Sequence, residues 1–330
     1  MTKLLKTAAF LLALIVSLAG LTGCRRDQSR PIILGFAQPQ TMEHPQGQMV
    51  ERIRERVAEL TNGAVVIRHF PSDQLGSQAD VFRQTVEGIN AIVIGDFASV
   101  QPYFADVAVF NLPYMFTSPE HMLNVLNSPL AQEMFDGITQ ASGLIPLGSL
   151  YFGTRVLTTR NVIATRPEDL RGVRIRSPQG TVMVDAVNSL GSTAVPMPLA
   201  ELYMALQTGT VEGQENPLQT IISNRFYEVQ NNVILTNHMI GLSIVFANQR
   251  IWNSIPDIYR TEIERIIYEE CLRTSNEIAA NETILRGELE ARGMRFITPD
   301  FDAFRTHSLN ETLRRYSQFS DLIARIVAIN

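Results

Sequence analysis

In segment 32–94, short continuous apolar runs alternate with stretches in which apolar residues recur at helical spacing, and this pattern predicts strands and helices in turn. Three short apolar runs, 32–36, 64–70 and 91–94, have the length and composition of buried strands. Between them, apolar residues recur at helical spacing over 49–60, before Gly63, and over 77–87, where Ser77 and Asp80 are typical of a helix start. This order predicts an α/β lobe with a largely parallel sheet.

A second α/β unit is expected over 147–242, and its most informative strand is 172–176. Residues in this strand alternate at period two, so Val173 and Ile175 can face a core. Arg174 and Arg176 then share the opposite face, where one of the two arginines can line a cleft.

Helix signals and an extended segment follow this strand. Pro178 suits the first turn of a helix that Gly191 ends, and a second helix is expected over 199–207, before Gly209. Asn216 precedes Pro217, which favours an extended backbone at Asn216. We expect the Asn216 amide to be free to point at a ligand.

The C-terminal third predicts a chain that returns to the first lobe. Residues 243–247 form another apolar strand, and 256–293 carry one long helical pattern. A coiled-coil pair is the alternative for this long helix, but a sustained heptad is not evident. The fold class expected is α/β, with two interdigitated lobes.

The N-terminus has the features of a bacterial lipoprotein signal. Lys3 and Lys6 precede an apolar run that ends at the sequence Leu-Thr-Gly before Cys24. We expect residues 1–23 to be a cleaved signal peptide, Cys24 to carry lipid and 24–31 to be a tether. Two or more acyl chains anchor a protein stably. The alternative is a plain signal with an incidental cysteine.

Composition excludes several kinds of chemistry. Lys3 and Lys6 are the only lysines, so the chain after the signal has no Schiff-base or phosphate-loop lysine. The five histidines lack metal-site spacing, and Cys271, the one cysteine besides Cys24, is expected to be a buried apolar residue. The formal net charge of −5 and the absence of a basic tract argue against nucleic acid. We expect no catalysis, no cofactor and no metal.

Several separated motifs follow one another along the chain: FPSDQLGS at 70–77, LPYMF at 112–116, GTR at 153–155, PEDLRGVRIR at 167–176, PMPLAELYMALQTGTVEGQENP at 196–217 and LTNH at 235–238. In kind and order these motifs resemble those of the solute-binding proteins of TRAP transporters, the DctP-type family. The resemblance runs from Ile32 to the C-terminus. It implies a hinged periplasmic binding protein in which the long C-terminal helix crosses both lobes.

The resemblance also implies a substrate-binding site. Arg176 would pair with a substrate carboxylate, and Arg155 and Asn216 would add polar contacts. Residue type alone allows other roles: a solvated charge for Arg176, a structural ion pair for Arg155 and turn chemistry for Asn216. Leu199, where the family often has an aromatic residue, and Gln78 are the expected cleft wall. Glu212 stands where the family usually has aspartate.

These expectations define the domains and the function. We expect lobe 1 to comprise 32–152 with 241–280, and lobe 2 to comprise 153–240 with 281–330. The protein would bind a small carboxylate-containing organic acid and deliver it to the small and large TRAP membrane subunits, in the periplasm and tethered to a membrane. A lipoprotein that presents its ligand to a chemoreceptor or sensor kinase is the first alternative, and a periplasmic enzyme using acidic residues is the second.

Overall fold

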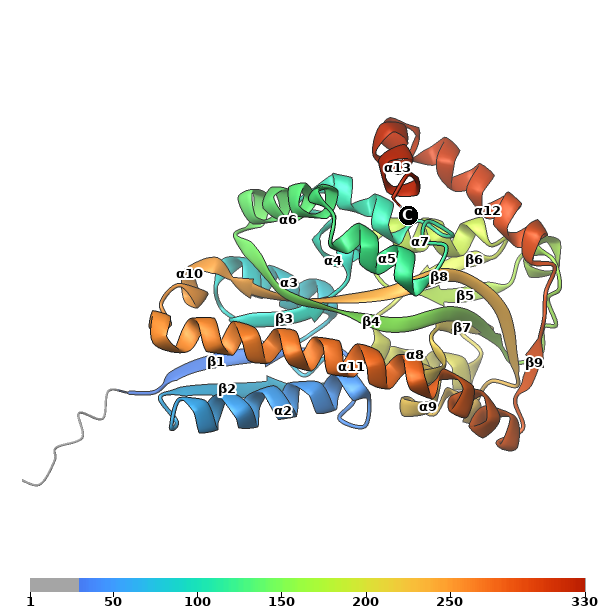
Figure 1. Ribbon diagram of the computed structural model, residues 1–330. Helices are drawn as coiled ribbons and strands as arrows, with labels where there is room; N and C mark the ends of the chain where they lie inside the picture. Colours follow the sequence, from blue (N-terminus) through green and yellow to red (C-terminus); the bar gives the residue numbers. More distant parts are fainter. Residues whose placement is uncertain (1–29, 330) are drawn as a thin grey trace, which may run out of the picture.

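One mixed sheet of nine strands organises residues 30–329, the part of the chain that this computed structural model describes (Figure 1). The strand order is β2-β1-β3-β8-β4-β7-β5-β6, and β9 pairs with β8. The strands are β1 (Ile32–Ala37), β2 (Val65–Phe70), β3 (Ile92–Gly95), β4 (Leu144–Thr159), β5 (Arg174–Ser177), β6 (Thr193–Pro196), β7 (Gly213–Asn216), β8 (Asn232–Asn248) and β9 (Arg295–Ile297).

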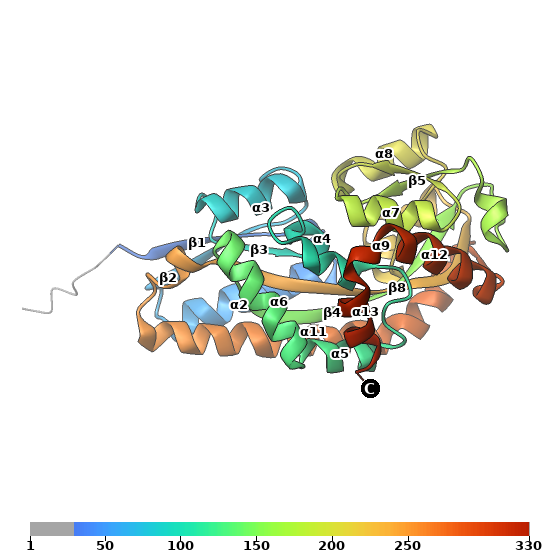
Figure 2. The same ribbon diagram turned by 90° about the horizontal axis from the view of Figure 1, so that it is seen from above.

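Helices cover both faces of this sheet (Figures 1 and 2). The α-helices are α2 (Pro45–Leu60), α3 (Gln78–Glu87), α4 (Phe97–Val100), α5 (Pro119–Leu126), α6 (Pro129–Ser142), α7 (Thr181–Ser189), α8 (Leu199–Thr208), α9 (Leu218–Ser223), α10 (Gln249–Trp252), α11 (Asp257–Ala291), α12 (Phe301–Arg315) and α13 (Ser320–Val327). Four short 3-10 helices are η1 (Ala105–Asn111), η2 (Pro167–Leu170), η3 (Phe226–Glu228) and η4 (Ser317–Phe319). The expected α/β class is confirmed.

The first lobe is built on parallel strands, as the sequence pattern predicts. β1 pairs in parallel with β2 and with β3, and α2 and α3 connect the three strands. Helix α3 begins where expected, because the Ser77 side chain accepts a hydrogen bond from the Asp80 backbone N–H. It ends at Gly88, whose φ of 77° is accessible to glycine at little energetic cost.

The second lobe repeats this plan around β5. β5 pairs in parallel with β6 and with β7, and α7 and α8 form the connections. Helix α8 closely matches its predicted range and ends at Gly209, and Gly191 follows α7 as expected. The prediction for the start of α7 was wrong: the helix begins at Thr181 after Gly180, so Pro178 lies in the preceding extended segment.

Two long antiparallel strands join the lobes. β4 and β8 pair from Leu144 with Asn248 to Thr159 with Asn232. The 244–247 part of β8 pairs with β3 in the first lobe, whereas the 156–159 part of β4 pairs with β7 in the second. The predicted return of 243–247 to the first lobe is therefore confirmed, and the lobes are interdigitated.

Helix α11 runs along both lobes (Figure 2). Its 35 residues confirm the long helix predicted over 256–293. Glu270 of α11 bonds to Arg52 and Arg56 of α2, at 2.6 and 2.8 Å. The Ser275 hydroxyl accepts a hydrogen bond from the backbone N–H of Tyr151 on β4. The helix is thus attached both to the first lobe and to the strands that join the lobes.

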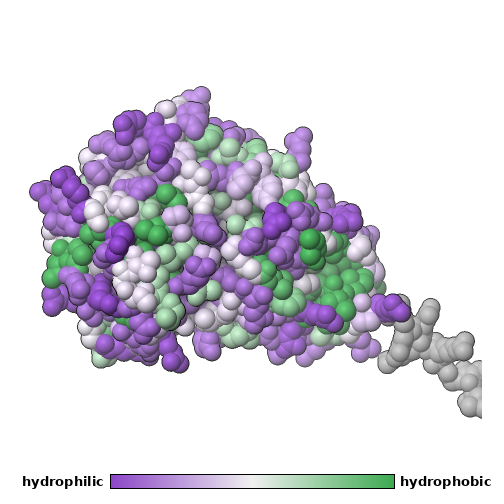
Figure 3. Space-filling view, turned by 180° about the vertical axis from the view of Figure 1, so that it is seen from behind, coloured by the Kyte–Doolittle hydropathy of each residue, from purple (hydrophilic) through white to green (hydrophobic). Residues whose placement is uncertain are grey.

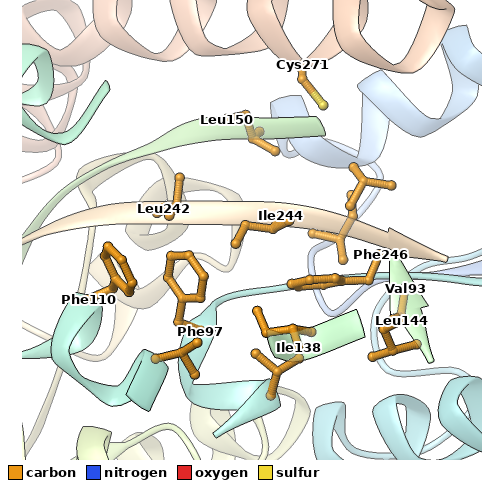
Figure 4. Close-up of a cluster of buried hydrophobic side chains, with 14 of the residues drawn as sticks. Val93, Phe97, Phe110, Ile138, Leu144, Leu150, Leu242, Ile244, Phe246 and Cys271 are labelled. Carbon is orange, nitrogen blue, oxygen red and sulfur yellow. The ribbon is translucent and has the colours of Figure 1, made fainter. Parts of the chain in front are cut away.

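The largest hydrophobic cluster lies between β3, β4, β8 and α11. Figure 4 shows side chains from these elements meeting, with Cys271 pointing from the helix towards the strands. Cys271 is buried, and burial raises the pKa of its thiol to about 12, which confirms its expected role as a small apolar core residue. The cluster also takes in Met183 and Ala186 of α7 and Ile326 of α13.

The face of the molecule shown in Figure 3 is mainly hydrophilic, with patches of hydrophobic residues towards its two sides. Within residues 30–329, no helix is both long and apolar enough to cross a membrane. The predicted signal peptide, Cys24 and nearly all of the predicted tether lie outside the described residues.

Candidate functional site

Parallel strands of both lobes end at a cleft that lies between the lobes. Gln40, Asp73 and Asp96 follow β1, β2 and β3 of the first lobe, and Arg176 and Asn216 lie at the ends of β5 and β7 of the second. Ligands of α/β proteins bind outside the carboxyl ends of the strands.

The structure brings together every cleft residue predicted from the sequence. Each of the five contributes to the lining of this one cleft: Arg155, Arg176, Asn216, Leu199 and Gln78. Leu199 and Gln78, the first residues of α8 and α3, are half-buried and lie on opposite lobes.

Arg176 is a buried guanidinium without a carboxylate partner. It is 3% exposed, and its Nε and Nη2 atoms both donate to the Met197 carbonyl, at 3.1 and 2.8 Å. Within residues 30–329 no carboxylate lies within ion-pair distance of it. Burial lowers the pKa of Arg176 to about 10; the neighbouring Arg155 also lowers it, while Glu215 and Asp73 act in the opposite direction. Arg176 is therefore charged at neutral pH.

Arg155 has the opposite environment. Its Nε and Nη2 atoms donate to the Glu215 carboxylate at 2.5 and 2.7 Å, and both side chains are buried. His238 lies 3.3 Å from the same carboxylate, and its other ring nitrogen contacts Thr236. Burial alone would raise the pKa of Glu215, but the charge of Arg155 and hydrogen bonds from His238 and Arg155 lower it to about 2. Arg155 thus forms the structural ion pair that residue type allowed, and it also lines the cleft.

Asn216 is extended, as predicted, but its amide is not free. The Oδ1 atom accepts from Arg155 at 3.1 Å, and Nδ2 donates to Gln214 at 2.6 Å. The expectation of a free amide was wrong because a polar group 3% exposed needs partners within the protein.

Arg174 does not line the cleft, although the period-two pattern places it on the same strand face as Arg176. It is exposed, and its guanidinium donates to Glu212 at 2.6 Å and to the Gly209 carbonyl at 2.9 Å. Arg174, at the start of β5, is thus held in a surface ion pair with Glu212. Arg176 is the arginine of this strand that lines the cleft.

Polar residues that the sequence analysis did not single out line the first-lobe side. Among these are Gln40, Gln46, Asp73 and Asp96. Asp73 lies within the FPSDQLGS motif, and its φ of 56°, like the 54° of Ser72, is uncommon outside glycine. The sequence signal available for Asp73 was its place in the FPSDQLGS motif.

No group of three or more histidine, cysteine, aspartate or glutamate side chains within residues 30–329 is arranged to hold a metal ion. The residues in the cleft are suited to binding polar and charged groups through hydrogen bonds.

Comparisons with known proteins agree with this geometry. Residues 36–318 match the model of the bacterial extracellular solute-binding protein family 7, DctP. The sialic acid-binding periplasmic protein SiaP of Vibrio cholerae is 27% identical over 253 residues, covering 77% of this chain and 78% of SiaP. The C4-dicarboxylate-binding periplasmic protein DctP of Rhodobacter capsulatus is 27% identical over 243 residues, covering 73% and 72% of the two chains.

Solved structures show the same architecture. A TRAP periplasmic solute-binding protein from Roseobacter denitrificans, with bound 3-deoxy-D-manno-oct-2-ulosonic acid, has a TM-score of 0.85 and 26% identity, covering 91% of this chain and 100% of that one. A second, from Pseudomonas putida with bound D-glucuronate, has a TM-score of 0.84 and 25% identity, covering 90% and 97%. This chain therefore belongs to the DctP family, bacterial extracellular solute-binding protein family 7, and is a periplasmic TRAP solute-binding protein that binds its solute without catalysing a reaction.

Proposed function

We propose that the solute is a small organic acid and that Arg176 binds its carboxylate. The observation that carries the proposal is the buried Arg176 guanidinium, which has no ion pair among the described residues. A buried charge is costly unless it is paired. A ligand carboxylate entering the cleft would supply the missing partner through charge-assisted hydrogen bonds.

Arg155 and Asn216 would support this contact rather than duplicate it. Arg155 is held by Glu215, and Asn216 is held by Arg155 and Gln214, so the three groups form one fixed hydrogen-bonded unit beside Arg176. Fixed polar groups orient a ligand at little entropic cost. Leu199 and Gln78 would form the walls that contact the remainder of the acid.

The ligands of the relatives support a carboxylate. The Roseobacter denitrificans structure holds 3-deoxy-D-manno-oct-2-ulosonic acid, the Pseudomonas putida structure holds D-glucuronate, and one from Actinobacillus succinogenes, 27% identical, holds L-galactonate. All three compounds are acids, while the rest of each molecule differs. This supports the carboxylate at Arg176 without choosing the remainder of the ligand.

We further propose that the lobes close on the acid as hinged units, 32–152 with 241–280 and 153–240 with 281–330. The crossing strands β4 and β8 would bend between them. The closed form would then deliver the acid to the small and large TRAP membrane subunits. Helix α13 contacts the first lobe through an Arg325–Glu133 ion pair, so the C-terminal segment would span both units.

The membrane tether is a separate proposal that rests on the sequence around Cys24. A lipid on Cys24 would hold the receptor at a membrane on the periplasmic side. Labelling cells with a radioactive fatty acid tests this directly. We expect label on the wild-type protein and none on Cys24→Ala, and an unlabelled wild type would contradict the tether.

A thermal-shift panel of organic acids followed by calorimetry tests the carboxylate assignment. A ligand present at about 100 times its dissociation constant adds about 2.7 kcal/mol, which raises the melting temperature of a chain of this length by roughly 4 °C. The acid that gives the largest shift is then compared with its neutral amide. Equal affinity for the acid and the amide would contradict a site built on Arg176.

A further inference from the structure

We infer that the cleft selects acids with one carboxylate and a separate hydrogen-bond-donating group, either hydroxyl or ammonium, and rejects dicarboxylates, and that Asp73 determines this selection. The inference rests on the proposed function, because it takes the ligand carboxylate to lie at Arg176. It adds the chemistry of the remainder of the ligand, which the carboxylate assignment leaves open.

The two sides of the cleft differ in hydrogen-bonding character. The second lobe contributes the guanidinium groups of Arg155 and Arg176. The first lobe contributes two carboxylates, Asp73 and Asp96, and the side-chain amides of Gln40, Gln46 and Gln78. A carboxylate bound at Arg176 therefore leaves the remainder of the ligand facing the first lobe.

Hydrogen bonds fix the orientation of the Gln46 amide. The backbone N–H of Gln40 can only donate, so the Gln38 atom that it contacts at 2.7 Å is the amide oxygen. Gln46 contacts the same oxygen at 3.1 Å and must donate to it through Nε2. The Oε1 atom of Gln46 is then an acceptor, and it has no partner although the residue is only 1% exposed.

Gln40 has a similarly unpartnered oxygen. Its Oε1 atom is buried and accepts no hydrogen bond from the described residues. A buried acceptor without a partner is unfavourable by about 1–3 kcal/mol. Two such oxygens in one wall are therefore complementary to a donor on the ligand.

Asp73 places a carboxylate on the same wall. It follows β2, is half-buried and forms no ion pair with any residue of 30–329. Its burial raises its pKa to about 6, although a backbone hydrogen bond from Ala200 and the charge of Arg176 act in the opposite direction. At pH 8 the carboxylate is ionised, so it accepts hydrogen bonds and repels a second anion.

Charge balance leads to the same ligand. Four ionisable side chains line the cleft, namely Asp73, Asp96, Arg155 and Arg176, and Arg155 is already neutralised by Glu215. The unpaired groups are one guanidinium and two carboxylates. Asp96 accepts hydrogen bonds from Ser99, and its burial raises its pKa while Ser99 and the charge of Arg155 act in the opposite direction, so the negative charge that a ligand meets is assigned to Asp73 alone. One ligand carboxylate matches Arg176, whereas a second would meet the carboxylate of Asp73.

Calorimetry at pH 8 with end-group series of fixed carbon chain tests the inference. The four-carbon series is succinate, 4-hydroxybutyrate and 4-aminobutyrate, and the six-carbon series is D-glucarate, D-gluconate and 6-amino-6-deoxy-D-gluconate. We expect the hydroxy or amino member to bind at least tenfold more tightly than the dicarboxylate. Tighter binding of the hydroxy acid would identify the donor group of the ligand as a hydroxyl, and tighter binding of the amino acid would identify it as an ammonium.

The variant Asp73→Asn tests whether Asp73 causes the preference for the donor-bearing acid over the dicarboxylate. It keeps the shape and removes the charge, and we expect it to reduce the preference at least threefold. Asp136→Asn is the matched control, because Asp136 is exposed on α6 and does not line the cleft. If Asp73→Asn does not fold, Gln46→Met serves instead and is expected to weaken the donor-bearing acid at least threefold relative to the dicarboxylate.

The outcomes separate this inference from the proposed function. Tighter binding of a dicarboxylate, or an unchanged preference in Asp73→Asn, overturns the inference and leaves the carboxylate at Arg176 standing. Failure of every acid in both series and in the thermal-shift panel overturns the carboxylate assignment, and the inference with it.

Discussion

Arg155 and Glu215 form a buried ion pair through two hydrogen bonds, of 2.5 and 2.7 Å, directly beside the unpaired guanidinium of Arg176. The positive charge of Arg155 is therefore largely compensated by the carboxylate of Glu215. The two arginines in the cleft differ in environment for this reason: Arg155 is paired with Glu215 and bonds Asn216, whereas Arg176 has no ion pair among the described residues and is the group that we propose for the ligand carboxylate.

Glu215→Gln should destabilise the protein strongly. The substitution leaves Arg155 buried without its countercharge, and breaking a buried pair in this way costs about 3–5 kcal/mol. Urea unfolding at pH 7, followed by circular dichroism, measures the loss. A loss below about 1 kcal/mol would show that Arg155 finds other partners.

The stabilisation by Glu215 should also depend on pH. The folded-state pKa of Glu215 is about 2, below its ordinary value of 4.5, so its contribution is complete above pH 4.5 and is lost as pH falls towards 2. The difference between these two pKa values corresponds to about 3 kcal/mol of unfolding free energy at neutral pH. We expect the stability gap between wild type and Glu215→Gln to narrow between pH 5 and pH 3, and a constant gap would contradict the low pKa.

Arg176→Lys should weaken ligand binding although it keeps the charge. Two guanidinium nitrogens donate to the Met197 carbonyl, which leaves the remaining N–H groups for a ligand. A lysine ammonium lacks this planar set of donors. Loss of one charge-assisted hydrogen bond should cost about 1.5–3 kcal/mol, roughly ten- to a hundredfold in affinity, measured by calorimetry with the acid that the panel identifies.

Arg174→Ala is the matched control for Arg176→Lys. Arg174 lies two residues away on the same strand, but it is exposed and paired with Glu212. Its removal should change affinity less than twofold. Wild-type affinity in Arg176→Lys would mean that charge alone holds the ligand.

The sequence predicted elements well where local signals were strong. Ser77 and Gly88 mark the ends of α3, and Gly209 ends α8, because caps and left-handed glycines act within one helical turn. Helix α2 begins at Pro45, earlier than its apolar pattern indicates, because the His44 side chain accepts a hydrogen bond from Gln46 and this cap has no apolar signature.

The site was predictable only in part. Motifs identified Arg155, Arg176 and Asn216, but partners distant along the chain decide what each side chain does. Asn216 meets Arg155 across the β4–β7 pairing, and Glu215, although it lies in the same motif as Asn216, is paired with an arginine 60 residues away along the chain. Asp73 enters the cleft because the folded lobes bring β2 opposite α8, a relationship that local periodicity does not contain.

Glu270→Ala should loosen the attachment of α11 to α2. Glu270 is 3% exposed and bonds both Arg52 and Arg56. Because these arginines are partly solvated, we expect a loss of about 2 kcal/mol in unfolding free energy. Glu290→Ala removes an exposed pair with Arg286 on the same helix and should cost no more than about 0.5 kcal/mol. Equal effects of the two substitutions would contradict a structural role for the buried glutamate.

Gly241→Ala should disturb the place where the long strands pass between the lobes. Gly241 pairs with Gly153 across β4 and β8, next to a register shift, and a Cβ atom at Gly241 would lie 2.6 Å from the Gly153 carbonyl oxygen. That contact is with backbone, so relief requires the strands to move apart. We expect a loss of about 1–3 kcal/mol in unfolding free energy and weaker ligand binding.

Gly287→Ala is the control for Gly241→Ala. Gly287 lies within α11, and a Cβ atom there meets nothing within 4 Å, so the helix should gain roughly 0.5–1 kcal/mol. Urea unfolding and calorimetry on both variants separate the effects, and a Gly241→Ala protein with wild-type stability and affinity would show that the strands tolerate separation at this point.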